Sequence, residues 1–132
     1  MSEEFKLEIV NPEKSFLLKD NVTEVVVPGY EGEMGILKEH ISIISFLKPG
    51  IIKIFSKTGE ERYYVDDGIV EFKDNQLSIL TSLILSIDKM DKNKIVQILK
   101  QAEKETNDKE VDDQKRYLLN QKIDVLRSIS TG

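Results

Sequence analysis

Few residues in this chain could carry out chemistry, and His40 stands out because it is the only histidine among 132 residues. The chain has no cysteine, so disulfides, cysteine metal sites and a thiol nucleophile are excluded, and one imidazole cannot form a histidine-rich metal site. A Ser-His-Asp triad lacks the Gly-x-Ser-x-Gly turn that would support it, and there is no Gly-x-x-x-x-Gly-Lys-Ser/Thr phosphate loop. We therefore expect no enzyme, no metal and no cofactor.

Carboxylates are abundant, with 24 Asp and Glu against 19 Lys and Arg. Asp66 and Asp67 are adjacent, but they fall in a predicted turn, where aspartate is favoured because it hydrogen-bonds the backbone. They are weak support for a paired-carboxylate enzyme. The net charge of −5 also argues against nucleic-acid binding, because the chain has no general phosphate-neutralising surface.

Charge and turn residues divide the chain near residue 87. Residues 1–87 carry 9 basic and 15 acidic side chains, whereas residues 88–132 carry 10 and 9. All three prolines and six of the seven glycines lie at or before Gly68; turn formers punctuate β structure, and long stretches without them favour helices. The sequence predicts an N-terminal antiparallel β-sandwich (1–87) followed by a C-terminal two-helix hairpin (88–132).

Short strands account for the first part. Phe5, Leu7 and Ile9 alternate with polar residues, which is the period-two pattern of a half-buried strand. Further strands are predicted at 15–18, 22–27, 50–55, 62–65, 68–72 and 76–80. Strands of about five residues, with turns roughly every eight to twelve, are typical of a sandwich or a barrel.

Two amphipathic helices are predicted in the second part. Asp91 is the expected N-cap of the first helix. Asp112 or Asp113 is the expected N-cap of the second, which runs to about Ser130. The first helix carries one apolar stripe at helical spacing: Ile95, Ile98, Leu99 and Ala102.

The second helix carries two apolar ridges. At 100° per residue, Lys115 and Lys122 fall between these ridges, inside an arc that should be buried. Buried lysine is costly unless it is paired or its amine reaches water. Either the lysines reach water along the sandwich surface, or the helix leaves the sandwich at times and the lysines then meet an acidic partner. The ridges are Leu119, Ile123, Leu126 and Leu118, Val125, Ile129.

The segment from Val25 to His40 is the richest in sequence signals. Its glycines at 29, 32 and 35 recur every third residue. This spacing indicates a strand, a tight loop whose glycines permit positive φ, and a return strand at Ile36. Two shorter signals, Leu47-Lys-Pro-Gly50 and Asp67-Gly-Ile-Val-Glu71, follow in order.

This ordered set closely resembles the epsilon subunit of the F-type ATP synthase. The resemblance spans nearly the whole chain, because the order, the length and the two-helix tail also match. Lys38 and Ser42 stand where the family usually has proline, and Asp67 stands where it usually has glycine. These departures affect the stiffness of turns more than the fold.

The resemblance implies a non-catalytic rotor subunit in the central stalk of a proton-translocating synthase, bound to gamma and resting on the c ring. The loop from Tyr30 to Gly35, which includes Glu31, would approach the polar loops of that ring. Glu33 matches the acidic position there, and a carboxylate that faces basic side chains is physically sensible. The alternative interpretation of Glu33 is a turn residue that faces only solvent. His40 matches a position near gamma; its alternative is a local structural hydrogen bond.

The tail resembles the family's regulatory hairpin, which folds down on the sandwich or extends up the stalk and impedes hydrolysis. Extended, its basic residues would meet acidic segments of the alpha/beta catalytic head; the alternative is a solvated charged face. The matching basic residues are Lys109, Lys115, Arg116, Lys122 and Arg127.

Some family members also bind ATP at the start of the first helix. Asp91 is kept here, but Lys94 lacks the planar two-donor fork of the family's arginine. Ile95 replaces a small alanine, and Gln101 replaces a second arginine. Asp91 and Lys94 are thus a remnant of the ATP motif, and we expect no tight ATP site.

An independent β-sandwich binding module, for a carbohydrate or a protein, is the alternative function. A carbohydrate module usually exposes aromatic platforms, and this chain has no tryptophan. No apolar run approaches the ~20 residues that span a bilayer. The resemblance therefore implies a subunit held peripherally, through its complex, at the cytoplasmic side of a bacterial inner membrane.

Overall fold

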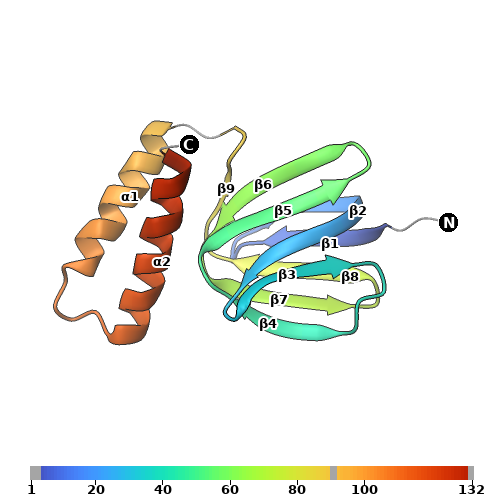
Figure 1. Ribbon diagram of the computed structural model, residues 1–132, viewed down its shortest axis with the longest axis horizontal. Helices are drawn as coiled ribbons and strands as arrows, with labels where there is room; N and C mark the ends of the chain where they lie inside the picture. Colours follow the sequence, from blue (N-terminus) through green and yellow to red (C-terminus); the bar gives the residue numbers. More distant parts are fainter. Residues whose placement is uncertain (1–3, 90–91, 131–132) are drawn as a thin grey trace.

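The computed structural model describes residues 4–89 and 92–130, in which β strands are followed by a helical hairpin (Figure 1). Asp91, the predicted N-cap, lies outside the described residues. The strands are β1 Phe5–Val10, β2 Ser15–Gly29, β3 Gly32–Leu37, β4 Ile43–Leu47, β5 Gly50–Ser56, β6 Gly59–Val65, β7 Gly68–Lys73, β8 Gln76–Thr81 and β9 Ile84–Ser86. The helices are α1 Lys92–Thr106 and α2 Asp113–Ser130.

The strands are hydrogen-bonded in the order β1-β8-β7-β4-β2-β5-β6-β9, and β3 pairs with β2. The long strand β2 closes the sandwich, because its first half pairs with β1 and its second half with β3 and β5. The predicted sandwich is confirmed. One of its pairings, β1 with β8, is parallel; parallel neighbours need a long connection, and here β2 to β7 intervene.

Alternating side chains form the sandwich core. Phe5, Leu7 and Ile9 are buried as the period-two pattern predicts, and the Phe5 ring meets Phe72 edge-on with centroids 5.5 Å apart. The main core cluster is Phe5, Leu7, Ile9, Val22, Val25, Val27, Ile36, Leu47, Ile52, Ile54, Tyr63, Val65, Val70, Phe72, Leu77 and Ile79.

The strand predictions fail in three places. Segments 15–18 and 22–27 are one 15-residue strand, because the polar residues between them lie at positions that are partly or fully exposed. The strands β4 and β9 were not predicted. In β4 the sequence Ile-Ile-Ser-Phe-Leu places apolar residues on both faces of the sheet, so the period-two signal is lost.

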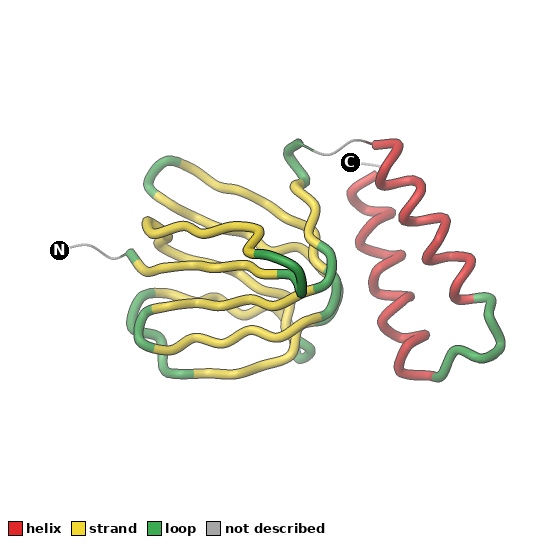
Figure 2. Tube along the Cα trace, turned by 180° about the vertical axis from the view of Figure 1, so that it is seen from behind, coloured by secondary structure: helices red, strands yellow, loops and turns green. Residues whose placement is uncertain are grey.

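The two helices run antiparallel, and α2 lies nearer the sandwich than α1 (Figure 2). The backbone N–H of Lys115 donates to the Asp112 carboxylate at 2.7 Å, so Asp112 is the N-cap of α2. Two clusters hold the hairpin in place. One joins it to the sandwich through Tyr64, Leu85, Ile95 and Leu126, and the other joins the helices through Ala102, Leu119 and Ile123.

Candidate functional site

The turn between β2 and β3 projects two carboxylates into solvent. Gly29 pairs with Gly32 across the turn, and Gly32 has a φ of +130°, a conformation that suits glycine because a side chain would strain it. Glu31 and Glu33 are exposed on either side of Gly32. The turn can therefore present negative charge to a partner, and no described contact of either carboxylate opposes that use.

Tyr30, in the same turn, is engaged with the hairpin. Its ring stacks on that of Tyr117 in α2, with centroids 6.4 Å apart and planes inclined by 17°. Burial, and then the charges of Asp67 and Tyr117, raise the pKa of Tyr30 above its usual value. The structure thus joins the turn to α2, a relationship that the sequence reading did not include.

His40 makes local contacts, as the interpretation of this residue as structural predicts. Its ring Nδ1 donates to the carbonyl of Ile41 at 2.8 Å, and the ring meets Phe72 edge-on with centroids 6.0 Å apart. Glu39 beside it has a φ of 64°, and its N–H donates to the Asn75 side chain at 2.8 Å. His40 therefore stabilises this turn, and a contact with a partner stays a prediction.

The predicted basic residues of α2 are mostly used within the chain. Arg116 donates to the carbonyls of Thr106 and Asp108 and so closes the loop between the helices. Arg127 pairs with Glu103 of α1 at 2.6 Å. The described contacts thus employ these guanidinium groups to hold the hairpin together.

Lys122 and Lys115, predicted in one buried arc, differ in the structure. Lys122 is largely buried, and its Nζ lies 3.3 Å from Oδ1 of Asp66. Lys115 is exposed, so its predicted burial is wrong. The reason is that the buried residues of α2 begin only at Leu119, one turn after Lys115. Both lysines line a cavity of about 180 Å³ between α2 and the sandwich, together with Asp66 and Asp67.

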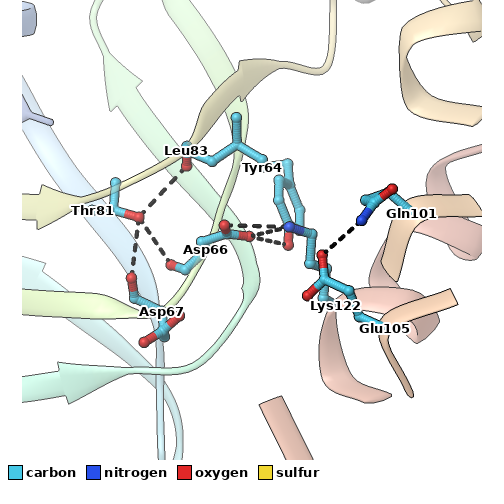
Figure 3. A network of polar contacts seen from close by, with 8 residues as sticks. All are labelled: Tyr64, Asp66, Asp67, Thr81, Leu83, Gln101, Glu105 and Lys122. Carbon is cyan, nitrogen blue, oxygen red and sulfur yellow. Dashed lines mark hydrogen bonds and ion pairs between the residues drawn. The ribbon is translucent and has the colours of Figure 1, made fainter. Parts of the chain in front are cut away.

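Asp66 is the centre of a polar network between the sandwich and α2 (Figure 3). The hydroxyl of the buried Tyr64 donates to its carboxylate at 2.8 Å, and burial, followed by the charge of Asp66, raises the Tyr64 pKa far above its usual value. The Thr81 hydroxyl lies 3.1 Å from the Asp66 carbonyl and 3.2 Å from that of Asp67. The sequence predicted the turn that contains Asp66 and identified Lys122 as unusual. It could not show that these two residues, 56 positions apart, form a pair.

A second surface that the sequence reading missed is an apolar patch on the outer face of β4, β7 and β8. Phe46 lies opposite Ile69, and Ile69 lies opposite Leu80. Phe46 is 63% exposed, and Ile44, two residues before it, is 71% exposed. We call these four residues the apolar patch. A contiguous exposed apolar surface typically marks a site of protein association; the signal in the sequence was the presence of apolar residues on both faces of β4.

Of the predicted ATP-motif remnant, Asp91 lies outside the described residues, so the absence of a tight ATP site stays a prediction. Lys94 is exposed, and Ile95 is buried in the cluster that joins the hairpin to the sandwich. The Gln101 amide donates to Glu105 at 3.3 Å. Within residues 4–89 and 92–130, no group of three or more His, Asp or Glu residues is placed to hold a metal ion. None of the described helices is long and apolar enough to cross a membrane.

The fold and these surfaces define a docking protein, in which a small sandwich presents an apolar patch and an acidic turn and carries a hairpin on one end. Comparison with known proteins identifies the family. The family model "ATP synthase, Delta/Epsilon chain, beta-sandwich domain" matches residues 4–86. The chain is 68% identical over 130 residues to the ATP synthase epsilon chain of Pelagibacter ubique, covering 98% of this chain and 100% of that one.

The chain therefore belongs to the ATP synthase epsilon chain family, whose members are non-catalytic subunits of the complex. The recognition from sequence and the prediction of an accessory subunit are both confirmed.

Two solved structures share the fold of the whole chain. A chain of the Euglena gracilis mitochondrial ATP synthase, from a structure of OSCP, F1 and the c-ring, superposes with a TM-score of 0.73 and 19% identity, covering 99% of this chain and 82% of that one. A chain of the Tetrahymena thermophila mitochondrial ATP synthase, from a structure of the central stalk and c-ring, gives 0.69 and 16%, with 98% of each chain covered. The sandwich-plus-hairpin arrangement is thus shared along its length.

Proposed function

We propose that this subunit lies in the central stalk of a proton-translocating ATP synthase, where it couples gamma and the c ring to the catalytic head. The observation that carries the proposal is the apolar patch, whose residues Phe46, Ile69 and Leu80 continue across three strands. A stalk subunit must be held firmly against a neighbour, and burial of exposed apolar surface is the main force in such association. The family and the stalk structures with the same fold support this location.

Gamma is the partner that we assign to the apolar patch. Ile41, which is 78% exposed, lies next to His40, the residue that the family resemblance places near gamma. A groove lined by Ser42, Ile44 and Glu71 connects this turn to the patch. The local hydrogen bond of His40 would then hold the turn in shape while Ile41 and the patch supply the contact area.

The c ring is the partner that we assign to the turn between β2 and β3. Glu31 and Glu33 are exposed there, and carboxylates on a turn favour basic partner loops through charge complementarity. Tyr30 would contribute the part of its ring that is exposed beside Tyr117.

The hairpin is the regulatory part in this proposal, with the domain boundary between residues 87 and 88. When extended, it would restrain ATP hydrolysis, with Lys115, Arg116, Lys122 and Arg127 facing acidic segments of the alpha and beta subunits. Among the described residues, one apolar cluster, the Tyr30–Tyr117 stack and the Lys122–Asp66 ion pair attach it to the sandwich, and so small a set of contacts supports reversible docking. The complex would hold the subunit at the cytoplasmic side of a bacterial inner membrane.

Co-purification with gamma tests the proposal. Phe46→Glu places a charge in the centre of the apolar patch and should abolish co-purification. Val96→Glu is the control, because Val96 is an exposed apolar residue, at 38%, on α1 of the hairpin rather than on the strands of the patch. If both variants retain gamma equally well, the patch is not the gamma-binding surface.

A further inference from the structure

The ion pair between Lys122 and Asp66 lies where α2 meets the sandwich. The side chains of Lys122 and Asp66 are 20% and 16% exposed, so both charges are mostly removed from water. The pair adjoins the apolar cluster formed by Tyr64 and Leu126, both fully buried. Charge pairing and apolar packing therefore act at the same point of the interface.

The carboxylate of Asp66 is held in place from within the sandwich. It accepts a hydrogen bond from the Tyr64 hydroxyl at 2.8 Å, and the Thr81 hydroxyl fixes the backbone of the same turn. These contacts do not involve the hairpin (Figure 3), so they would persist if it moved away. Lys122, in contrast, takes its charge partner from the opposite side of the interface.

We propose that the network of Tyr64, Asp66 and Lys122 is a polar latch that sets how readily the hairpin leaves the sandwich. The latch rests on the hairpin release described under Proposed function and gives it a specific control point. Asp66 acts as the internal counter-ion of Lys122 and competes for it with any acidic surface of the catalytic head.

The energetics of a desolvated pair give the latch a distinctive signature. Removing one partner leaves the other charge without its counter-ion at a mostly dry site, which is strongly unfavourable. Removing both charges while keeping similar volume is often close to neutral. Single substitutions should therefore release the hairpin, and the double substitution should restore docking.

Native-state thiol labelling measures this release directly. The chain has no cysteine, so Leu126→Cys introduces a single thiol that is buried when the hairpin is docked and reacts when it leaves. In this background Asp66→Asn and Lys122→Met should each raise the labelling rate about five- to twentyfold, an effect between those of exposed and fully buried ion pairs. The double variant should return close to the parent rate.

Two controls make the result specific. Lys100→Met removes an exposed lysine of the hairpin that does not line the cavity around Asp66, and it should leave the rate unchanged. Val70→Cys, used in place of Leu126→Cys, puts the single thiol in the sandwich core. It reports unfolding of the sandwich and should label equally slowly in all the variants.

The latch is overturned if Lys122→Met labels no faster than Lys100→Met, or if the double variant labels as fast as the faster single variant. Labelling uses the isolated chain and does not depend on hydrolysis. If the latch variants release the hairpin while hydrolysis by the assembled complex is unchanged, the inhibitory role fails and the latch stands.

Discussion

Tyr30 and Tyr117 stack with nearly parallel rings, whose centroids are 6.4 Å apart and whose planes are inclined by 17°, and so connect the acidic turn between β2 and β3 to the N-terminal part of α2. The two residues are 87 positions apart in the chain, and each is about two-fifths exposed, at 40% and 43%. A partner that binds the turn would therefore meet a surface to which α2 contributes only when the hairpin is docked.

The stack should make a measurable contribution to hairpin docking. Tyr117→Ala removes it and is expected to weaken docking by about 0.5–1.5 kcal/mol, the usual range for aromatic pairs. The labelling rate of a thiol at position 126 measures the change. Tyr117→Phe is the control, because the ring remains, and it should behave like the parent. Equal labelling of the two variants would mean that the rings touch without holding the hairpin.

Substitution by alanine should cost more stability at Gly68 than at Gly32. An added side chain at Gly68 meets the backbone of a neighbouring strand, whereas at Gly32 it meets open space. At Gly68 an added Cβ would clash with the Leu80 carbonyl oxygen, a backbone atom held by the pairing of β7 with β8. Gly68→Ala should therefore destabilise the sandwich by about 2–3 kcal/mol or more. At Gly32 a Cβ meets nothing, and only the φ of +130° opposes it, which costs about 1–2 kcal/mol.

Urea unfolding of both variants checks this order. Gly35→Ala is a useful third variant, because its Cβ would meet only the flexible end of the Glu24 side chain at 3.1 Å, and it should be the mildest. A larger loss at Gly32 than at Gly68 would contradict the assigned strand register of β7 and β8.

Much of this fold could be predicted from sequence, because alternation and helical spacing report directly on burial. Phe5, Leu7 and Ile9 showed their strand, and Ile95 and Ala102 showed the buried face of α1. Pairings across the chain could not be predicted, because neither spacing nor composition shows which distant side chains meet. Lys122 was recognised as unusual, but its partner Asp66 became known only from the structure.

The apolar patch illustrates a different limit. A strand with one buried face gives an alternating pattern, whereas β4 has Phe46 and Ile44 on its outer face as well. Such a strand looks like a fully buried segment when read in the sequence. The same feature that concealed β4 therefore marks the surface that we assign to gamma.

The sandwich should lose stability at high pH through Tyr63. Burial, and then the charge of Glu61, raise the pKa of Tyr63 to about 12, from a usual value of 10.0. The folded chain thus keeps the phenol proton over a pH range in which the unfolded chain loses it, so the contribution to stability is complete below pH 10 and is lost as pH rises toward 12. The urea midpoint should fall across that window.

Tyr63→Phe provides the comparison, because phenylalanine keeps the ring and removes the titrating group. Its urea midpoint should fall less steeply with pH than that of the parent. The buried Tyr64, whose pKa is also raised, titrates in the same direction and accounts for the slope that remains. An identical slope in the variant and the parent would show that Tyr63 does not contribute to the alkaline loss.

Deleting residues 88–132 should raise ATP hydrolysis by the assembled complex severalfold, because the deletion removes the proposed brake. Co-purification with gamma should persist, since the apolar patch lies on the retained strands β4, β7 and β8. In the full-length chain, Lys115→Gln should relieve the brake in part, while Lys100→Gln, an exposed lysine on the other helix, serves as the charge-matched control. If hydrolysis is unchanged by the deletion in a complex that still contains the sandwich, the tail is not its inhibitor.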